Sequence, residues 1–337
     1  MQARKILSYL VLGLLVAGVT EARARRPKVQ FKVATVAPEG TTWMKLMHEM
    51  DDRVREETGG EVGFRFYPGG AQGSDLDVLR KIRSGQIHGA GLTGVGLGEL
   101  EPSLRVMELP FMFRSAKEVD VAHQHLDSIF EDRLRERGFE LLGWAEVGFV
   151  YLFSQDPVHS VDDVRQMKMW LWEGDPLAQA LLDEFGVSPV PLNVTDVLTS
   201  LQTGIVDAVY TTPYACLSLQ WFTRLQHMTD VPITYAIGAV VVSRRAWERM
   251  SPDQETTVRR IAEDVFGRLA DATRRENAES SDVVAERNIA RVAVDPASRS
   301  GFESTGQHVW DRMAGKLYEP DLLTRLTAVL AEYRGGR

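Results

Sequence analysis

A helix–glycine–strand unit that occurs twice constrains the fold more than any other feature of the sequence. Residues 77–90 read DVLRKIRSGQIHGA, and residues 196–209 read DVLTSLQTGIVDAV. In both copies, apolar residues at helical spacing predict a one-faced helix, which Gly85 or Gly204 ends with a left-handed turn. The apolar run that follows is typical of a buried parallel strand. Two copies predict two lobes built alike, with the strand ends near Thr93 and Thr211 as natural walls of a ligand cleft.

The first 24 residues have the pattern of a cleavable export signal. Arg4 and Lys5 precede an apolar run over residues 6–19, and residues 22–24 (Ala-Arg-Ala) form a small-x-small cleavage site. A membrane-spanning helix needs about 20 apolar residues, so the run is too short to favour an anchor. We therefore expect a periplasmic protein that begins near Arg25 and does not itself span the membrane.

Length and charge limit the remaining possibilities. A chain of 337 residues suits about two domains, and a formal net charge of −8 disfavours a surface for nucleic acid or anionic membranes. Cys216 is the single cysteine, so no internal disulfide can form. Its apolar neighbours indicate a buried small residue rather than a nucleophile.

No pattern of metal-binding or catalytic residues stands out. The sequence has no HExxH, CxxC or GxSxG motif, and His123 and His125 would point apart on a helix. Gly89, Gly91 and Gly94 match the letters of a dinucleotide fingerprint, but no obvious long helix follows them. We therefore expect no cofactor, no metal and no enzymatic activity. A secreted enzyme on the same two-lobed scaffold is the less favoured alternative.

Two apolar stretches and one long helix predict how the lobes connect. Residues 139–153 and 232–243 are apolar enough to cross between the lobes, which places a hinge near residues 147–150 and 237–239. Ser251 begins a helix with Pro252 at its first position and Gln254 at its third. The helix continues for about 35 residues, or roughly 50 Å, so we expect it to brace both lobes.

Four segments in order resemble the extracytoplasmic solute-binding proteins of TRAP transporters, the DctP family. The segments are EETGGEVGFRFYPGG, GSDLDVLRKIRSGQIHGAGLT, MELPFMF and PLNVTDVLTSLQTGIVDAVYTTP, followed by the helix that Ser251 begins. The resemblance covers residues 28 to 320. It implies an α/β fold like that of periplasmic binding proteins, with two α/β lobes around a ligand cleft and a long helix that spans both. It also implies capture of a solute by closure of the cleft, and delivery to the small and large subunits of a membrane permease.

The predicted lobes divide the chain as follows. Lobe I comprises residues 25–148 and about 238–277, and lobe II comprises residues 149–237 and about 278–337.

The chain departs from the family pattern at the residues that hold the ligand. The resemblance implies an Arg on the strand where this chain has Trp170, and a second Arg after Gly-Phe where it has Val150. Neither side chain can form the two parallel hydrogen bonds of an Arg–carboxylate pair. We therefore predict an apolar or amphipathic ligand rather than a classical small dicarboxylate. The alternative is an organic acid held by a relocated basic side chain, such as Lys168 or Arg105.

Thirteen residues are predicted to bind the ligand. The alternative for Trp170 is that it packs in the core, and the alternative for Glu173 is that it caps the helix that begins near Pro176. Thr93 would supply a hydroxyl, and the aromatic residues would supply an apolar wall. The full set is Glu39, Gln72, Thr93, Phe149, Val150, Tyr151, Trp170, Trp172, Glu173, Asn193, Tyr210, Thr211 and Tyr214.

Overall fold

The computed structural model describes residues 26–336, so the predicted export signal lies outside the described residues. Within that range, no helix combines the length and the apolar character that a bilayer crossing requires.

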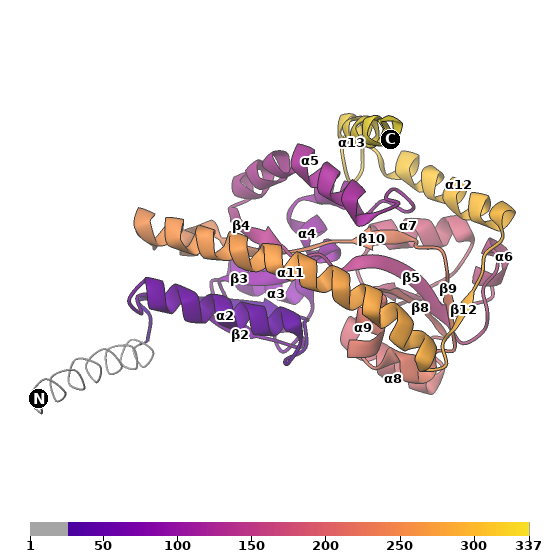
Figure 1. The fold of residues 1–337 in the computed structure, drawn as a ribbon, viewed down its shortest axis with the longest axis horizontal. Helices are drawn as coiled ribbons and strands as arrows, with labels where there is room; N and C mark the ends of the chain where they lie inside the picture. Colours follow the sequence, from indigo (N-terminus) through magenta and orange to yellow (C-terminus); the bar gives the residue numbers. More distant parts are fainter. Residues whose placement is uncertain (1–25, 337) are drawn as a thin grey trace, which may run out of the picture.

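A mixed five-stranded sheet forms the centre of the first lobe (Figure 1). Side chains alternate across it, so Val240 and Val242 enter one core and Val241 enters the core on the opposite face. In spatial order its strands are β2 (Val62–Tyr67), β1 (Val29–Thr35), β3 (Gly89–Thr93), β11 (Gly238–Ser243) and β4 (Phe139–Trp144). Helices on its faces include α2 (Thr42–Glu57), α3 (Asp75–Arg83), α4 (Gly94–Leu100), α5 (Ala116–Glu136) and α10 (Arg244–Trp247).

The second lobe is built around β5, which pairs with three other strands. Its strands are β5 (Gly148–Ser154), β8 (Ala208–Thr211), β9 (His227–Thr229), β10 (Thr234–Ala236) and β12 (Ala290–Val292), with a separate parallel pair β6 (Trp170–Trp172) and β7 (Val190–Leu192). Its helices are α6 (Val161–Val164), α7 (Pro176–Phe185), α8 (Val197–Thr203), α9 (Pro213–Ser218) and the 3-10 turns η2 (Val194–Asp196) and η3 (Trp221–Arg224). The two sheets, the helices that pack on them and the long helix confirm the predicted α/β architecture.

The repeated unit forms as the sequence predicts. Gly85 follows α3 with φ +77°, and Gly204 follows α8 with φ +72°, so both glycines adopt the left-handed conformation that ends each helix. The strands that follow differ, because β3 pairs in parallel with β1, whereas β8 pairs antiparallel with β5. The prediction of parallel strands is therefore right for the first copy and wrong for the pairing of the second copy with β5.

The chain crosses between the two sheets at two adjacent points. β4 ends before residue 145 and β5 begins at Gly148, while β10 and β11 are separated by Ile237 alone. Ala145 donates its N–H to the carbonyl of Gly238 at 2.8 Å, and Val147 donates to the carbonyl of Ala236 at 3.1 Å. The stretch 139–153 is therefore two strands in two sheets, and the crossings coincide with or adjoin the predicted hinge positions.

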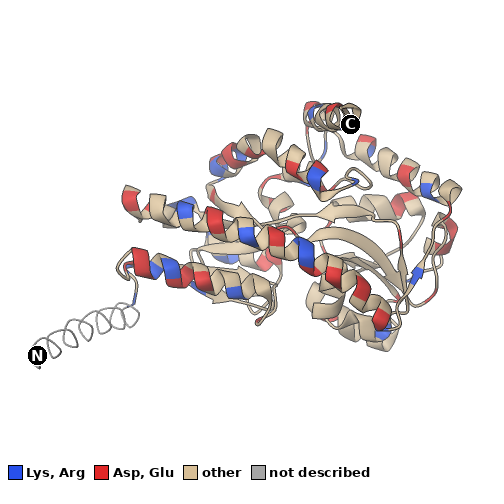
Figure 2. Cartoon of the chain, in the orientation of Figure 1, with Lys and Arg blue, Asp and Glu red and all other residues tan. Residues whose placement is uncertain are grey.

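Helix α11 (Pro252–Glu286) spans both lobes, as predicted (Figure 1). A capping box between Ser251 and Gln254 begins it. Its first half lies beside α2, and acidic and basic residues are interspersed along both helices (Figure 2). The ion pairs between them include Arg53–Asp264, Arg260–Glu57 and Arg268–Glu49. Its second half contacts α9 and β5 of the second lobe.

The carboxyl-terminal helices contact one lobe each. Helix α12 (Pro296–Met313) packs against α7 of the second lobe. Helix α13 (Pro320–Gly335) packs against α5 of the first lobe, where Arg334 pairs with Glu118 at 2.7 Å. The chain therefore returns to the first lobe after α12, while the predicted lobe boundaries remain a prediction.

Candidate functional site

A cavity of about 320 Å³ lies where the two lobes, the two crossings and α11 meet. This volume falls at the lower end of the range for small-molecule sites, roughly 300–1,000 Å³. Lining residues come from the loop after β1, the end of β3, the strands β5, β6 and β8, and helix α9. The position agrees with the predicted cleft near Thr93 and Thr211, both of which line it.

Seven of the thirteen predicted ligand residues line this cavity. They are Thr93, Val150, Trp170, Trp172, Tyr210, Thr211 and Tyr214. The other six lie outside the lining. They are Glu39, Gln72, Phe149, Tyr151, Glu173 and Asn193.

Strand alternation explains two of the six. Val150 and Leu152 of β5 line the cavity, so Phe149 and Tyr151 face the opposite side of the strand. Phe149 packs edge-on against Tyr235 there, with ring centroids 4.9 Å apart. Three consecutive side chains of one strand cannot all face one cleft, which the sequence prediction overlooked.

Two more have partners within the first lobe. Glu39 pairs with His48 at 3.1 Å, and both side chains are exposed. The Gln72 side chain accepts a hydrogen bond from Lys81 at 3.2 Å.

Glu173 and Asn193 form a hydrogen bond with each other, and Glu173 does not cap helix α7. The Asn193 amide donates to Glu173 at 2.8 Å. Asp175 caps α7, because its carboxylate accepts the N–H groups of Leu177 and Ala178 at 3.0 and 3.1 Å. The capping role considered for Glu173 therefore belongs to Asp175.

Trp170 is a core residue and a cavity wall at once. Only 1% of it is exposed to solvent, and its indole N–H donates to the carbonyl of Leu192 at 3.0 Å. Its ring stacks on Tyr210 with centroids 5.0 Å apart, and it meets Trp221 edge-on at 5.2 Å and Trp172 at 5.6 Å. The four rings form one aromatic wall, whose rigidity comes from the core behind it.

A buried ionic cluster that joins the 3-10 turn η1 to the start of α7 lines the cavity. Arg105 lies in the 3-10 turn η1 (Pro102–Glu108) and is 4% exposed, while Glu108 and Asp175 are each 7% exposed. Arg105 Nη2 donates to Asp175 Oδ1 at 2.9 Å, and Nε lies 2.9 Å from Glu108 Oε2. Nη1 has no hydrogen-bond partner among the described residues, and Nε contacts Glu108 as an ion pair only. Because buried polar groups are normally paired, this donor is available to a polar group of a molecule in the cavity.

The chain builds this cluster from three distant segments. Glu108 Oε1 accepts the N–H of Ile237 at 2.8 Å, at the second crossing. Its other oxygen occupies the space that a side chain at Gly94 would fill, since a Cβ atom there would lie 1.8 Å from Oε2. Burial, reinforced by Asp175, raises the pKa of Glu108 against the opposing effect of Arg105. Burial acts to lower the pKa of Arg105, but Asp175 and Glu108 more than offset it, so the guanidinium stays charged.

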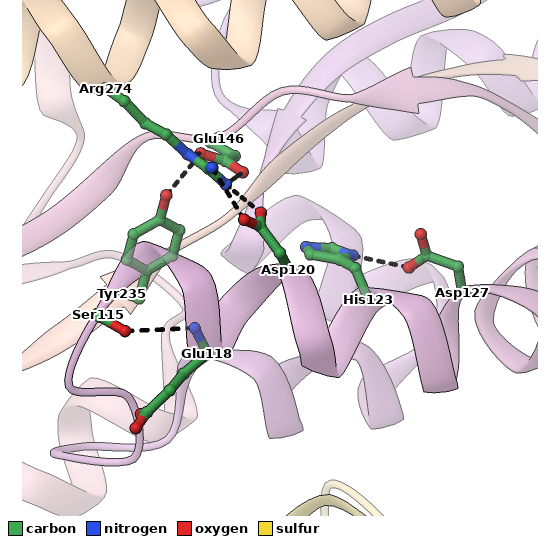
Figure 3. Close-up of polar contacts among 8 residues, drawn as sticks. All are labelled: Ser115, Glu118, Asp120, His123, Asp127, Glu146, Tyr235 and Arg274. Carbon is green, nitrogen blue, oxygen red and sulfur yellow. Dashed lines mark hydrogen bonds and ion pairs between the residues drawn. The ribbon is translucent and has the colours of Figure 1, made fainter. Parts of the chain in front are cut away.

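A second ionic cluster ties the crossings to α11 (Figure 3). Arg274 binds both oxygens of Glu146, at 2.9 and 2.5 Å, and both oxygens of Asp120 in α5, at 3.2 and 2.5 Å. The Tyr235 hydroxyl donates to Glu146 at 2.5 Å from β10. Hydrogen bonds to Glu146 lead the causes that raise the pKa of Arg274. Asn277, one turn further along α11, donates to the carbonyl of Val147 at 2.8 Å.

Other chemically interesting side chains have structural explanations. Cys216 is buried, as predicted, and burial raises the pKa of its thiol to about 12, so it is not a ready nucleophile. His123 contacts Asp127 at 2.7 Å on α5. Residues 26–336 contain no cluster of three or more His, Cys, Asp or Glu side chains placed to hold a metal ion.

Sequence reasoning missed the Glu108–Asp175 part of the cavity cluster and all of the Arg274 cluster. It named Arg105 only as an alternative, together with Lys168. A usable signal was the pair Arg105 and Glu108 at a spacing of three residues inside an otherwise apolar segment. The partners from α7, α11 and the crossings become visible only when the chain is folded.

Comparisons with known proteins agree with this architecture. The family model described as bacterial extracellular solute-binding protein, family 7 (DctP), matches residues 33–317. A solute-binding protein from Chromohalobacter salexigens is 23% identical over 287 residues, which cover 85% of this chain and 84% of that protein.

Solved structures share the fold at low sequence identity. A TRAP periplasmic solute-binding protein from Xanthobacter autotrophicus Py2 with bound β-D-galacturonate has a TM-score of 0.83 and 18% identity. One from Ralstonia eutropha H16 with bound (S)-2-acetolactate has a TM-score of 0.84 and 20% identity. Each alignment covers 90% of this chain and 99% of the other. Because the family model matches most of its length, this chain belongs to the DctP family of bacterial extracellular solute-binding proteins, a family of binding proteins rather than enzymes.

Proposed function

We propose that this protein captures an organic acid whose carbon skeleton is largely apolar, with Arg105 as the partner of the ligand carboxylate. It acts outside the cytoplasm and passes the solute to the membrane subunits of a TRAP transporter. The observation that carries the proposal is the unpaired Nη1 of Arg105, on a guanidinium that lines the cavity and is 4% exposed.

Of the two basic residues considered as relocated clamps, only Arg105 is placed to act. Lys168 is exposed, donates to the carbonyl of Gly204 at 3.2 Å and does not line the cavity. Arg105 is the one Lys or Arg among the described lining residues. Charge-assisted hydrogen bonds to carboxylates are worth about 1.5–3 kcal/mol, which is enough to select an acid over a neutral analogue.

The aromatic wall supports the apolar part of the proposal. Trp170, Trp172, Tyr210 and Trp221 surround one side of the cavity, and Trp43 of α2 lines another. A single guanidinium suits one carboxylate, whereas a small dicarboxylate would leave its second charge against carbon surfaces, at a cost of several kcal/mol. The ligand therefore combines one acid group with an apolar body.

The ligands of the related structures favour an acid over a neutral apolar molecule. β-D-Galacturonate and (S)-2-acetolactate each carry one carboxylate. These ligands support the alternative that the sequence left open, a carboxylate held by a relocated basic residue, better than a ligand without charge.

The same geometry supports the proposal that the cleft closes on the ligand. The cavity is bounded by both lobes, and the two crossings lie side by side with α11 tied across them. Closure on the ligand would bury the carboxylate–Arg105 contact and stabilise the bound form. Small-angle scattering should therefore give a smaller radius of gyration at ligand saturation, and an unchanged radius would count against hinge closure.

Calorimetry with matched ligands tests the proposed ligand class. Phenylacetate and its neutral amide, phenylacetamide, have the same apolar ring and differ in charge. We expect the acid to bind at least about tenfold more tightly than the amide, as one charge-assisted bond implies. D-Galacturonate and succinate serve as polar acids for comparison. Equal binding of acid and amide, or no binding of phenylacetate, would contradict the proposal.

A further inference from the structure

The cavity cluster has more negative than positive groups before any ligand arrives. Arg105 supplies one positive charge, and Glu108 and Asp175 supply two carboxylates, all at least nine-tenths buried. With every group ionised, the cluster carries a net charge of −1. Carboxylates that share one buried site cannot all ionise without strong mutual repulsion, which raises the affinity of one of them for a proton.

A ligand carboxylate at Nη1 would make this imbalance worse. Three carboxylates would then surround one guanidinium, and the net charge of the buried group would become −2. Water cannot screen the repulsion in a closed cavity, so the charges interact more strongly than at the surface. If one of the carboxylates takes up a proton, the net charge returns to −1, the value of the cluster without a ligand.

We propose that the organic acid binds with Glu108 in its neutral acid form, so that capture of the solute takes up a proton from solvent. This inference rests on the proposed function, because it requires a ligand carboxylate at Arg105. It makes Glu108 a specificity-determining residue, which permits an anion to enter a cluster that is already anionic.

The hydrogen bonds of the two acids indicate which one accepts the proton. Asp175 accepts three hydrogen bonds, from Arg105 and from the N–H groups of Leu177 and Ala178. Glu108 accepts one backbone hydrogen bond, from Ile237, besides its ion pair with Arg105. Burial also raises the pKa of Glu108, in the direction that the proposal needs.

The other groups that face Glu108 do not compete for the proton. Tyr210 on β8 accepts the N–H of Trp172 at 2.9 Å, and burial raises the pKa of its hydroxyl, so it stays neutral. Gly94 on α4 presents no side chain, and Ile237 presents a backbone N–H. Arg105 and Asp175 are therefore the charged groups against Glu108 among the described residues.

The sign of the pH dependence follows from linkage. If the bound form holds the proton more tightly than the free form, the dissociation constant rises with pH between the two pKa values of Glu108. The slope is at most about tenfold per pH unit, and the uptake is at most about one proton per ligand. Phenylacetate remains ionised above about pH 6, since carboxylic acids ionise near pH 4, so the ligand itself does not cause the slope.

The test is calorimetry of phenylacetate binding in phosphate and in Tris at one pH, repeated from about pH 6 to pH 9. A difference in apparent enthalpy between the buffers measures protons taken up. We expect uptake and a rising dissociation constant for the unmodified protein, and neither for Glu108→Gln, which mimics the neutral acid. Glu140→Gln is the matched control, because Glu140 is buried, pairs with Arg259 at 2.8 Å and does not line the cavity. It should behave like the unmodified protein.

The outcomes separate this inference from the proposed function. Preference for acid over amide without proton uptake and without a pH slope overturns the inference and leaves the proposed function standing. Equal binding of acid and amide overturns the proposed function. If Glu108→Gln does not fold, phenylacetamide provides the second comparison in the unmodified protein, because binding of the neutral amide should take up no proton.

Discussion

Arg105 and Arg274 each hold two carboxylates near the crossings, but only Arg105 has a buried nitrogen without a hydrogen-bond partner among the described residues. Arg274 uses its three nitrogens on Glu146 and Asp120, and its side chain is 30% exposed. The Arg105 side chain is 4% exposed, bonds Asp175 through one nitrogen and has no hydrogen-bond partner for Nη1 within residues 26–336. Both clusters consist of one guanidinium and two carboxylates. They differ in how many of the guanidinium nitrogens are hydrogen-bonded and in how deeply the Arg side chain is buried.

The difference assigns each arginine a different task. A saturated, partly solvated guanidinium fixes three segments at the crossings, and it has nothing to offer a ligand. A buried and unsaturated guanidinium is expensive in the empty protein, since the desolvation of its free N–H groups is not compensated. We interpret the Arg274 cluster as structural and the Arg105 cluster as the ligand anchor.

Replacing Arg105 should have the largest effect on stability. Arg105→Met leaves Glu108 and Asp175 buried without their cation, so we expect a loss of about 3–5 kcal/mol in the free energy of unfolding. Urea denaturation measures it. Arg244→Met is the surface control, because the Arg244–Glu248 pair is half exposed and should contribute less than about 1 kcal/mol. Similar losses in the two variants would contradict the buried role of Arg105.

Replacing Arg274 should have an intermediate effect. Arg274→Met removes bonds to two carboxylates, but Asp120 can turn to water, so we expect a loss of about 2 kcal/mol. The ratio of acid to amide affinity should change far less than in an Arg105 variant, because Arg274 does not itself line the cavity, although its partner Glu146 does. A lost preference for the acid in this variant would erase the distinction between the two clusters.

Replacing Asp120 should have the smallest effect. Its side chain is 42% exposed, and Glu146 still holds Arg274 in its absence. Asp120→Asn should therefore cost less than about 1 kcal/mol. Urea denaturation of Asp120→Asn and Arg274→Met under the same conditions compares their losses in the free energy of unfolding. A larger loss for Asp120→Asn would indicate that Asp120, and not Arg274, organises the cluster.

Local sequence patterns predicted much of the scaffold. The capping box at Ser251, the glycine stops at Gly85 and Gly204, and the 35-residue α11 are confirmed because each depends on neighbours within a few turns of chain. The cavity walls at Thr93 and Thr211 followed from the repeated unit, since strand ends converge on a cleft.

The ionic clusters could not be predicted in the same way. Arg105, Asp175 and Ile237 meet only because η1, α7 and the second crossing pack together. Nothing in the local sequence specifies that contact. The break between β4 and β5 was also not predicted, because Glu146 is the one acidic residue near it and a single acidic residue does not mark a strand end.

The role of Arg105 as the carboxylate anchor is tested most directly by comparing acid and amide binding in Arg105→Lys and in Arg274→Lys. Lysine keeps the positive charge beside Glu108 and Asp175, but it lacks the planar fork that places a free donor at Nη1. Calorimetry with phenylacetate and phenylacetamide should show that the preference for the acid falls at least about tenfold in Arg105→Lys and stays intact in Arg274→Lys. An unchanged preference in Arg105→Lys would contradict the assignment of Arg105 as the carboxylate anchor.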